Sequence, residues 1–287
     1  MIIVVKSYGL GDTICSTPAI RKIAKEFNTK IKIISYFPEV FTNLPYVSES
    51  IDLKTIPNGD HIHFSDGNIN YVLYSEEKQM MSDMMHSMID IRQYASIQCG
   101  FQLLNKEMDC DYIPTEPFNI NIPDEYIVVH PSTSWPVKTW DVDKWQELCN
   151  NIDLPVISIG KNETRRDWSY KCNKLNNVID LIDQTSLDQT WHLLDNAKYI
   201  ITADSGILHL AGTTDTEIVY IAIGKHPQLL APYRHQSQDY KMHIISNCNW
   251  CLSNLNCYNK SLLNCIFNKT NKTCQPSVDQ VLEVING

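Results

Sequence analysis

Hydrophobic and polar positions follow one another along the chain in a pattern that predicts strands and helices in turn. Short apolar runs are each followed by a loop and then by a stretch in which apolar residues recur at helical spacing. The first series predicts strands at 2–5, 31–34, 51–56 and 71–74, and helices at 13–27 and within 80–104. Such alternation is typical of a parallel sheet with helices on both faces.

A second series of the same kind begins near residue 126. It predicts strands at 126–130, 155–159, 178–181, 199–202 and 217–223, and helices at 142–150, 163–175, 186–196, 207–212 and 278–285. Between the two series, segment 105–124 contains three prolines and several acids, which favours a linker. We therefore predict an α/β protein with two Rossmann-like domains, residues 1–118 and 119–287, whose strand ends face a central cleft.

Composition agrees with this fold, and charge narrows the choice of partner. The 287 residues are 43% hydrophobic and 20% charged, as expected for a globular protein of two domains. The net charge of −9 disfavours nucleic acid, because it does not supply the positive field that a phosphate backbone requires. The sequence opens without a signal-like segment and has no long apolar run, so we expect a cytoplasmic protein.

The loop after the first predicted strand contains Gly9, Gly11 and Asp12. Glycine lets a backbone come close to a ligand, and free N–H groups stabilise a carboxylate at a helix start. Asp12 is therefore either a helix cap or a general base that accepts a proton from an acceptor hydroxyl.

The loop 130–140 follows the first strand of the second series and carries Thr133, Ser134 and Lys138. Hydroxyls and an ammonium group are the donors that a diphosphate needs where no metal is present. The alternative is a polar loop that packs over Trp140.

Another strand-to-helix loop contains Asp204, Ser205 and Gly206. Backbone N–H groups at such a helix start, together with the positive end of the helix dipole, suit a phosphate. His209 follows in the helix and either reaches the same site or is buried. Asp204 has the wrong charge for phosphate, so we expect it to orient the loop or to meet a sugar hydroxyl.

The loop after the second strand of this series contains Gly160 and Glu163. A carboxylate at this place can accept a hydrogen bond from a ribose or a base. The alternative is a glutamate in the first turn of a helix, which needs no ligand.

Together these loops resemble glycosyltransferase family 9, the heptosyltransferases of lipopolysaccharide core synthesis, over most of the chain. The matching segments are 9–18, 138–140, 160–163 and 204–211. The resemblance implies a GT-B fold and a metal-independent, inverting transfer of a heptose or hexose from a nucleotide-diphosphate donor. It implies no cofactor, and a glycan or lipid-linked acceptor whose use brings peripheral contact with a membrane.

The resemblance also implies roles for single residues. Asp12 matches the catalytic base, and Lys138 matches the cation that stabilises the departing diphosphate. The positions implied to bind the nucleotide sugar are Gly9, Gly11, Thr133, Ser134, Gly160, Glu163, Asp204, Ser205, Gly206 and His209.

Two other functions stay open. One is a glycosyltransferase that acts on a modified nucleic-acid base, against which the net charge counts. The other is a non-catalytic nucleotide-sugar-binding protein, against which the presence of both Asp12 and Lys138 counts. A dinucleotide oxidoreductase is disfavoured because the first loop lacks the full G-x-G-x-x-G motif. The sugar, the base, the acceptor and the oligomeric state are not determined by the sequence.

Two further patterns concern metals. Two Asp-x-Asp sequences, 109–111 and 141–143, are attributed to the acidic composition, since one lies in the linker and the other at a helix start. One Cys-x-x-Cys pair in the C-terminal region has zinc-ligand spacing, but the other spacings are irregular. A structural zinc, disulfides and free thiols therefore all stay open for Cys248, Cys251, Cys257, Cys265 and Cys274.

Overall fold

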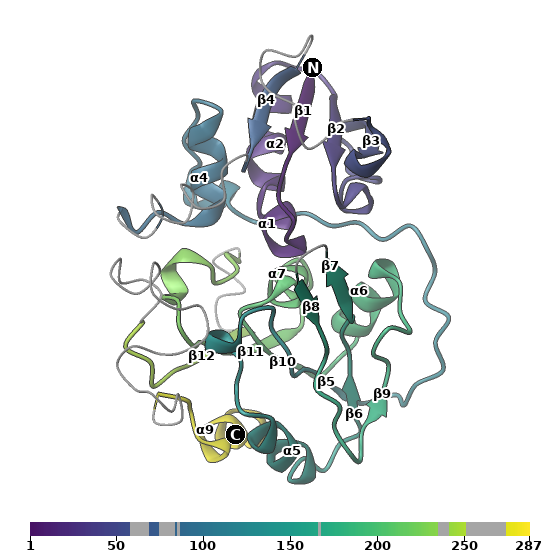
Figure 1. The fold of residues 1–287 in the computed structure, drawn as a ribbon, viewed down its shortest axis with the longest axis vertical. Coiled ribbons are helices and arrows are strands. Elements are labelled where there is room, and N and C mark those ends of the chain that lie inside the picture. Colours follow the sequence, from purple (N-terminus) through teal and green to yellow (C-terminus); the bar gives the residue numbers. More distant parts are fainter. Residues whose placement is uncertain (58–68, 75–83, 85–86, 166–167, 235–240, 251–273) are drawn as a thin grey trace.

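The computed structural model describes residues 1–57, 69–74, 84, 87–165, 168–234, 241–250 and 274–287. Two parallel sheets, each accompanied by helices, lie at opposite ends of the molecule, one with the N-terminus and the other with the C-terminus (Figure 1). The helix after the first strand reaches from the first domain toward the second. None of the described helices is long and apolar enough to cross a membrane.

The first sheet has the strand order β3-β2-β1-β4, and all its neighbours are parallel. Its strands are β1 (Ile2–Val5), β2 (Ile31–Ser35), β3 (Val47–Asp52) and β4 (Ile69–Leu73). The side chains of Ile3, Val4 and Val5 are fully buried, which explains why this strand is a continuous apolar run. The strand predicted at 51–56 lies earlier in the chain, at 47–52, and the 3₁₀ turn η2 (Leu53–Thr55) follows it.

The predicted helix at 13–27 consists of two helices, α1 (Leu10–Cys15) and α2 (Thr17–Glu26), separated at Ser16. Pro18 lies in the first turn of α2, where a proline removes no required hydrogen bond. Because α1 begins directly after Gly9, Asp12 lies inside the first turn of the helix rather than before it.

The segment 105–124, predicted as the linker, is irregular apart from one 3₁₀ turn. After α4 (Ile91–Gln98) and the 3₁₀ turn η4 (Asn105–Glu107), residues 108–126, all of them described, contain no helix or strand. Arg21 of α2 holds this segment by hydrogen bonds of 2.8 Å to the carbonyl oxygens of Glu107 and Asp109. Farther along, the Thr115 N–H donates to Asp188 in the second domain at 2.9 Å. The boundary between residues 118 and 119 stays a prediction.

The second sheet has the order β12-β11-β10-β5-β6-β9, again with parallel neighbours. Its strands are β5 (Ile127–His130), β6 (Val156–Ser158), β9 (Ile179–Asp180), β10 (Tyr199–Ala203), β11 (Glu217–Ile221) and β12 (Met242–Ile245). When the six strands are numbered in chain order and the sheet is followed from the β9 edge, the order is 3-2-1-4-5-6, as in a doubly wound dinucleotide-type sheet. The sequence reasoning missed β12, a partly exposed strand that, among the described strands, pairs with β11 alone.

The strand order reverses between β5 and β10 in the second sheet and between β1 and β4 in the first. In open α/β sheets, ligands bind beyond the carboxyl ends of the strands at such a reversal. A site is therefore expected after β1, β5 and β10. Asp12 lies in the first turn of the helix after β1, and Lys138 and Asp204 lie in the loops after β5 and β10.

Most helices of the second domain lie where the sequence predicts them. They are α5 (Val142–Asn150), α6 (Leu187–Asp195), α7 (Gly206–Ala211) and α9 (Val278–Asn286). The predicted capping box of α9 is present: the Gln280 N–H donates to Ser277 Oγ at 3.2 Å, and the Ser277 N–H donates to Gln280 Oε1 at 2.9 Å. Short 3₁₀ turns complete the domain, η5 (Pro136–Lys138) and η6 (Pro227–Leu229), and η1 (Pro38–Val40) belongs to the first domain.

The predicted helix at 163–175 is wrong. Strands β7 (Glu163–Arg165) and β8 (Trp168–Tyr170) form an antiparallel hairpin in its place. The sequence holds the signal for this, because Trp168, Tyr170 and Cys172 alternate with polar residues at strand spacing.

Candidate functional site

Helix α1 of the first domain packs against helix α7 of the second, and two glycines permit this contact. A Cβ atom on Gly11 would lie 2.5 Å from Cδ2 of His209, and a Cβ atom on Gly206 would lie 3.1 Å from Cβ of Leu10. His209 Nδ1 lies 3.2 Å from Cys15 Sγ, across the same contact. Gly11, Gly206 and His209 thus join the two domains in this structure, and their implied binding of a nucleotide sugar stays a prediction.

His209 is one of the buried groups at this contact. Its side chain is only 4% exposed, and burial lowers its pKa to about 3. The imidazole is therefore neutral at neutral pH. His209 is thus buried at the contact, and whether it also reaches the nucleotide sugar stays a prediction.

Asp12 projects from the first turn of α1 but does not cap the helix. The helix begins with Gly9 as its N-cap residue and has no side-chain cap, whereas the Ser7 hydroxyl donates to Asp12 Oδ2 at 2.8 Å. The Gly9 N–H in turn donates to Ser7 Oγ at 3.0 Å, so the loop backbone orients the serine that holds the carboxylate. Burial raises the pKa of Asp12, against the opposing effects of Lys225, Ser7 and Lys138.

Two lysines and one aspartate form a buried charge cluster in the second domain. Lys138 Nζ lies 3.0 Å and Lys225 Nζ 3.9 Å from Oδ2 of Asp204, and each ammonium lies 4.9 Å from the centroid of the Trp135 ring. Lys138 and Lys225 are each 7% exposed, and Asp204 is 4% exposed. Burial raises the pKa of Asp204, but the two lysines outweigh it and bring that pKa down to about 2. Asp204 is therefore ionised at neutral pH and orients two cations.

The hydroxyls of the loop 130–140 have different surroundings. Thr133 Oγ1 donates to the Trp135 carbonyl oxygen at 2.9 Å and lies 2.7 Å from Thr139 Oγ1, so this hydroxyl stabilises the loop itself. Ser134 is exposed. Trp140 is fully buried and donates to the Pro276 carbonyl oxygen, as expected from packing beneath the loop.

The remaining predicted positions are Ser205, Gly160 and Glu163. Ser205 Oγ lies 3.2 Å from His130 Nδ1, which joins the loop after β10 to the end of β5. Gly160 has a φ of +156°, and a Cβ atom there would lie 2.6 Å from Cys172 Sγ. Glu163 is the first residue of β7, and its side chain lies outside the described part of the chain.

The model of glycosyltransferase family 9 (heptosyltransferase) matches residues 79–261. The chain belongs to glycosyltransferase family 9. It is therefore a glycosyltransferase, as the resemblance of its loops implies. A sequence comparison with curated proteins found no match.

Solved structures with a similar fold include several members of glycosyltransferase family 9. The iron-containing dodecameric glycosyltransferase TibC from enterotoxigenic E. coli is 14% identical, with a TM-score of 0.69 over 99% of this chain and 76% of that one. A family 9 glycosyltransferase from Veillonella parvula is also 14% identical, with a TM-score of 0.66 over 99% and 96%. The E. coli heptosyltransferase WaaC with ADP is 12% identical, with a TM-score of 0.57 over 100% and 99%. These likenesses confirm the predicted GT-B fold of two Rossmann-like domains.

The sequence reasoning missed two members of the site, Lys225 and Ser7. Lys225 comes soon after the buried strand β11, at the carboxyl edge of the sheet, where open α/β sheets bind their ligands. The signal was thus available in the segment Gly224-Lys225, by the same rule that singled out Lys138. Ser7 lies shortly before Gly9, in the loop that the sequence already indicates as part of the site.

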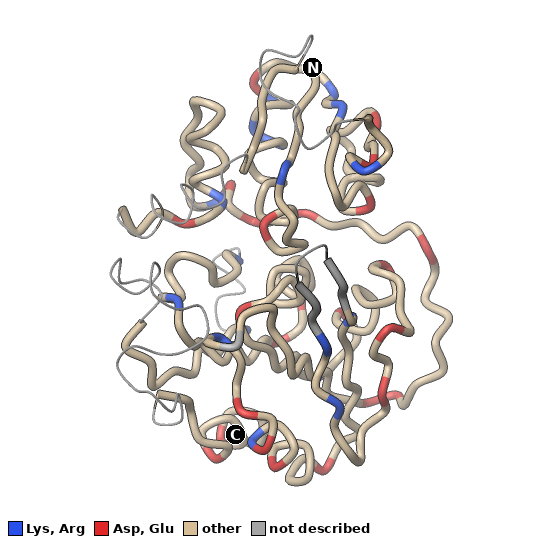
Figure 2. Tube along the Cα trace, in the orientation of Figure 1, with Lys and Arg blue, Asp and Glu red and all other residues tan. Residues whose placement is uncertain are grey.

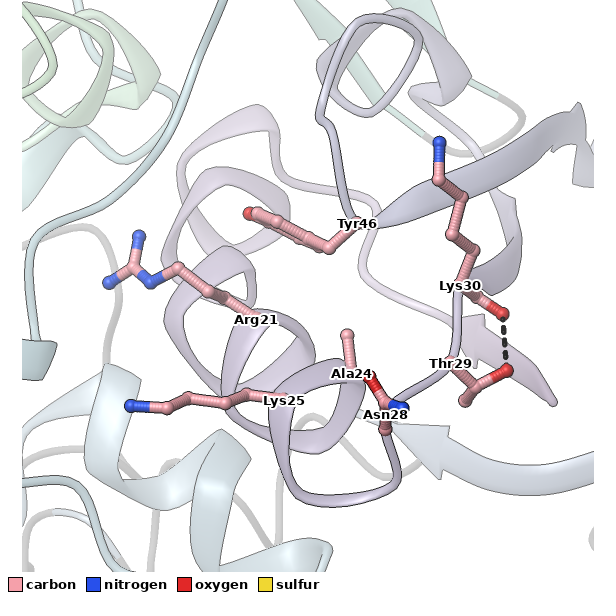
Figure 3. A pocket seen from close by; sticks show the side chains of 7 residues that line it. All are labelled: Arg21, Ala24, Lys25, Asn28, Thr29, Lys30 and Tyr46. Atoms are coloured by element: carbon pink, nitrogen blue, oxygen red, sulfur yellow. Dashed lines mark hydrogen bonds between the residues drawn. The ribbon is translucent and has the colours of Figure 1, made fainter.

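A separate pocket of about 340 Å³ lies on the first domain, lined by Arg21, Lys25, Lys30 and Tyr46 among others (Figure 3). The pocket lies next to the start of β2, whereas Asp12 follows the carboxyl end of the neighbouring parallel strand β1. The pocket and Asp12 therefore lie at opposite ends of these strands. In Figure 3 the ammonium groups of Lys25 and Lys30 point in different directions, and Arg21 forms an ion pair with Asp111. Because its cations do not converge, this pocket is a weaker candidate for the donor than the cluster around Asp204.

Within the described ranges, no group of three or more His, Cys, Asp or Glu residues could hold a metal ion. Cys251, Cys257 and Cys265 lie outside those ranges, so the proposed zinc site stays untested. Cys248 is buried, and its Sγ accepts a hydrogen bond from the Gly224 N–H at 3.2 Å. Of the two Asp-x-Asp sequences, one contributes Asp111 to the ion pair with Arg21, and the other contributes Asp141 as the cap of α5.

Proposed function

We propose that this glycosyltransferase moves a heptose or hexose from a nucleoside-diphosphate donor to a hydroxyl of a glycan or lipopolysaccharide-type acceptor, with inversion and without a metal. The observation that carries the proposal is the meeting of a carboxylate and buried cations at the switch points of two Rossmann-like sheets. Asp12 lies close enough to Lys138, Lys225 and Asp204 for their charges to act on its pKa.

In this mechanism Asp12 accepts the proton of the acceptor hydroxyl. The freed electron pair on the acceptor oxygen forms the new bond to the anomeric carbon, while the bond from that carbon to the diphosphate oxygen breaks. Burial raises the pKa of Asp12 and so makes the carboxylate a stronger base than an exposed aspartate. General-base assistance of this kind contributes roughly 10²- to 10⁴-fold in rate.

The departing diphosphate gains negative charge as the bond breaks, and Lys138 is the cation assigned to stabilise it. The ammonium of Lys138 is buried and held by Asp204 at 3.0 Å, so it is oriented before the donor arrives. Preorganised charge in a water-excluded site stabilises a transition state more than a mobile surface lysine does. Asp204 thus acts on the donor through Lys138, which fits its unfavourable charge for direct phosphate contact.

Solved relatives suggest the first donor to test. One structure of TibC is described as a complex with ADP-D-β-D-heptose, and another relative is described as an ADP-heptose lipopolysaccharide heptosyltransferase. We therefore propose ADP-heptose as the donor. A lipid-linked acceptor would bring this protein into peripheral contact with the cytoplasmic face of a membrane.

The test is a transfer assay with ADP-heptose and a panel of ADP-, UDP-, GDP- and CDP-hexoses, with lipopolysaccharide core fragments as acceptors. Release of the nucleoside diphosphate that requires acceptor, persists in EDTA and yields a product of opposite anomeric configuration by NMR supports the proposal. Donor binding with no acceptor-dependent release would favour the non-catalytic binding protein. Activity that EDTA abolishes would contradict the metal-free mechanism.

A further inference from the structure

Lys225 is a buried cation with no role in the mechanism above. It is 7% exposed, and its ammonium lies 3.9 Å from the carboxylate oxygen of Asp204 that Lys138 approaches to 3.0 Å. Burying an ammonium group is costly unless nearby groups compensate its charge. Asp204 is one such group, and it brings two buried ammonium groups together at a single carboxylate oxygen.

Strand order explains how the three groups meet. Asp204 follows β10, and the neighbours of β10 in the sheet are β5 and β11. Lys138 belongs to the loop after β5 and Lys225 to the loop after β11, so the two lysines come from the loops on either side of the one that holds Asp204. Both ammonium groups also lie 4.9 Å from the centroid of the same Trp135 ring, which restricts them to one small region.

We propose that Lys225 is a second phosphate-binding cation of this site, which acts together with Lys138 on the leaving nucleoside diphosphate. This inference rests on the function proposed above and adds a residue to it. An ammonium group binds phosphate as a point charge, so two of them from separate loops can contact different oxygens of one diphosphate.

The charges of the reaction support this role. Before transfer, the positive charges of Lys138 and Lys225 face the negative charges of Asp204 and an ionised Asp12. When Asp12 accepts the acceptor proton, the cluster is left with one surplus positive charge. In the same step the diphosphate gains one negative charge. The surplus positive charge therefore forms during bond breaking and can stabilise the leaving group.

Lys225 also affects Asp12, and this provides a second measurable signature. Among the charged groups that act on Asp12, Lys225 is the strongest that lowers its pKa, followed by Lys138, while Asp204 raises it. Three other titratable groups near α1 add no net charge at neutral pH. His209 is neutral, burial raises the pKa of Tyr74 well above its usual value, and Arg92 is paired with Asp90.

The first experiment is calorimetric binding of ADP and of adenosine to the full-length protein. Lys225→Met should weaken ADP binding by roughly 10- to 100-fold and leave adenosine binding unchanged, because a hydrogen bond to a charged group is lost. Lys225→Arg keeps the charge and should restore most of the affinity. Lys198→Met removes an exposed lysine of the same domain and should change neither ligand.

The second experiment is the pH dependence of kcat/KM for the donor. Loss of the Lys225 charge makes an ionised Asp12 less favourable, so the pKa of Asp12 rises. The acid limb of the profile should therefore move to higher pH in Lys225→Met and stay in place in Lys225→Arg and Lys198→Met. A lysine with a merely structural role would lower activity without moving this limb.

The outcomes separate this proposal from the function on which it rests. If the unchanged protein binds none of ADP, UDP, GDP and CDP, the proposed function fails and Lys225 loses its role with it. If one diphosphate binds and Lys225→Met binds it equally well, the role of Lys225 alone is overturned. Equal weakening of ADP and adenosine would also overturn it. Should Lys225→Met fail to fold, judged by circular dichroism, Lys225→Gln provides the same comparison with a polar side chain.

Discussion

The two domains begin with the same strand order but contribute different chemistry. The first domain has a sheet of order 3-2-1-4 and supplies one carboxylate, Asp12, from the first turn of the helix after β1. The second sheet continues the same order to 3-2-1-4-5-6 and supplies the cluster of Lys138, Asp204 and Lys225 from three neighbouring loops. A common topology thus determines where the site lies, and the loop residues determine its chemistry.

Charge is divided between the domains in a way that total composition does not reveal. Lys, Arg, Asp and Glu are interspersed over both domains (Figure 2), and the net charge is −9. Lys138 and Lys225 are nevertheless buried together at the carboxyl edge of the second sheet, whereas Asp12 comes from the first domain. The following predictions test this division of labour, beginning with the largest effect.

Replacing the carboxylate of the first domain should have the largest effect on catalysis. Asp12→Asn keeps the shape of the side chain but removes the base, so kcat should fall by roughly 10²- to 10⁴-fold. Binding of the nucleoside diphosphate to the second domain should stay nearly unchanged, which calorimetry can check. Asp143→Asn, an exposed aspartate in α5, is the matched control. Normal turnover by Asp12→Asn would remove the proposed base.

Acid should weaken the contact between the domains through His209. The pKa of His209 in the folded protein is about 3, below its usual value of 6.5, so the unfolded chain binds this proton more readily. A neutral His209 therefore contributes to the free energy of unfolding above pH 6.5. This contribution is lost as the pH falls toward 3, by roughly 4 kcal/mol over the whole range. Urea unfolding at several pH values measures this slope, and His209→Gln should flatten it. An equal slope in His209→Gln would exclude His209 as its source.

Breaking the ion pair of the second domain should affect both stability and binding. Lys138→Met leaves Asp204 with Lys225 at 3.9 Å, so we expect a destabilisation of about 2 kcal/mol and weaker donor binding. The double variant Lys138→Met/Asp204→Asn should recover part of the stability but none of the donor binding. Recovery of binding in the double variant would argue against a phosphate-binding role for Lys138.

The last prediction concerns stability alone, at the glycines of the contact between α1 and α7. A Cβ atom on Gly11 would lie 2.5 Å from His209, so Gly11→Ala should destabilise the protein by about 1 to 3 kcal/mol. A Cβ atom on Gly206 would lie 3.1 Å from Leu10, so Gly206→Ala should destabilise the protein less than Gly11→Ala. Thermal unfolding compares the two variants. The reverse ranking would show that the contact adjusts more easily at His209 than at Leu10.

Patterns that depend on neighbouring residues were predictable from the sequence. The apolar run of β1 and the capping box at Ser277 and Gln280 depend on short-range interactions, and both are present as predicted. The alternation of Trp168, Tyr170 and Cys172 with polar residues is equally local, so strand β8 was also predictable from the sequence. Asp12, Lys138 and Asp204 could be selected because each follows a predicted strand.

What the sequence by itself determined was therefore the type of fold and the loops that carry charged groups. Only the tertiary structure decided which of those groups meet. Lys225 joins Asp204 and Lys138 because β11, β10 and β5 are neighbours in the sheet, although the three residues lie far apart in the chain. Asp12 joins them because α1 packs on α7 through Gly11 and Gly206. Strand order and packing between domains are collective properties, so no local pattern in the chain encodes them.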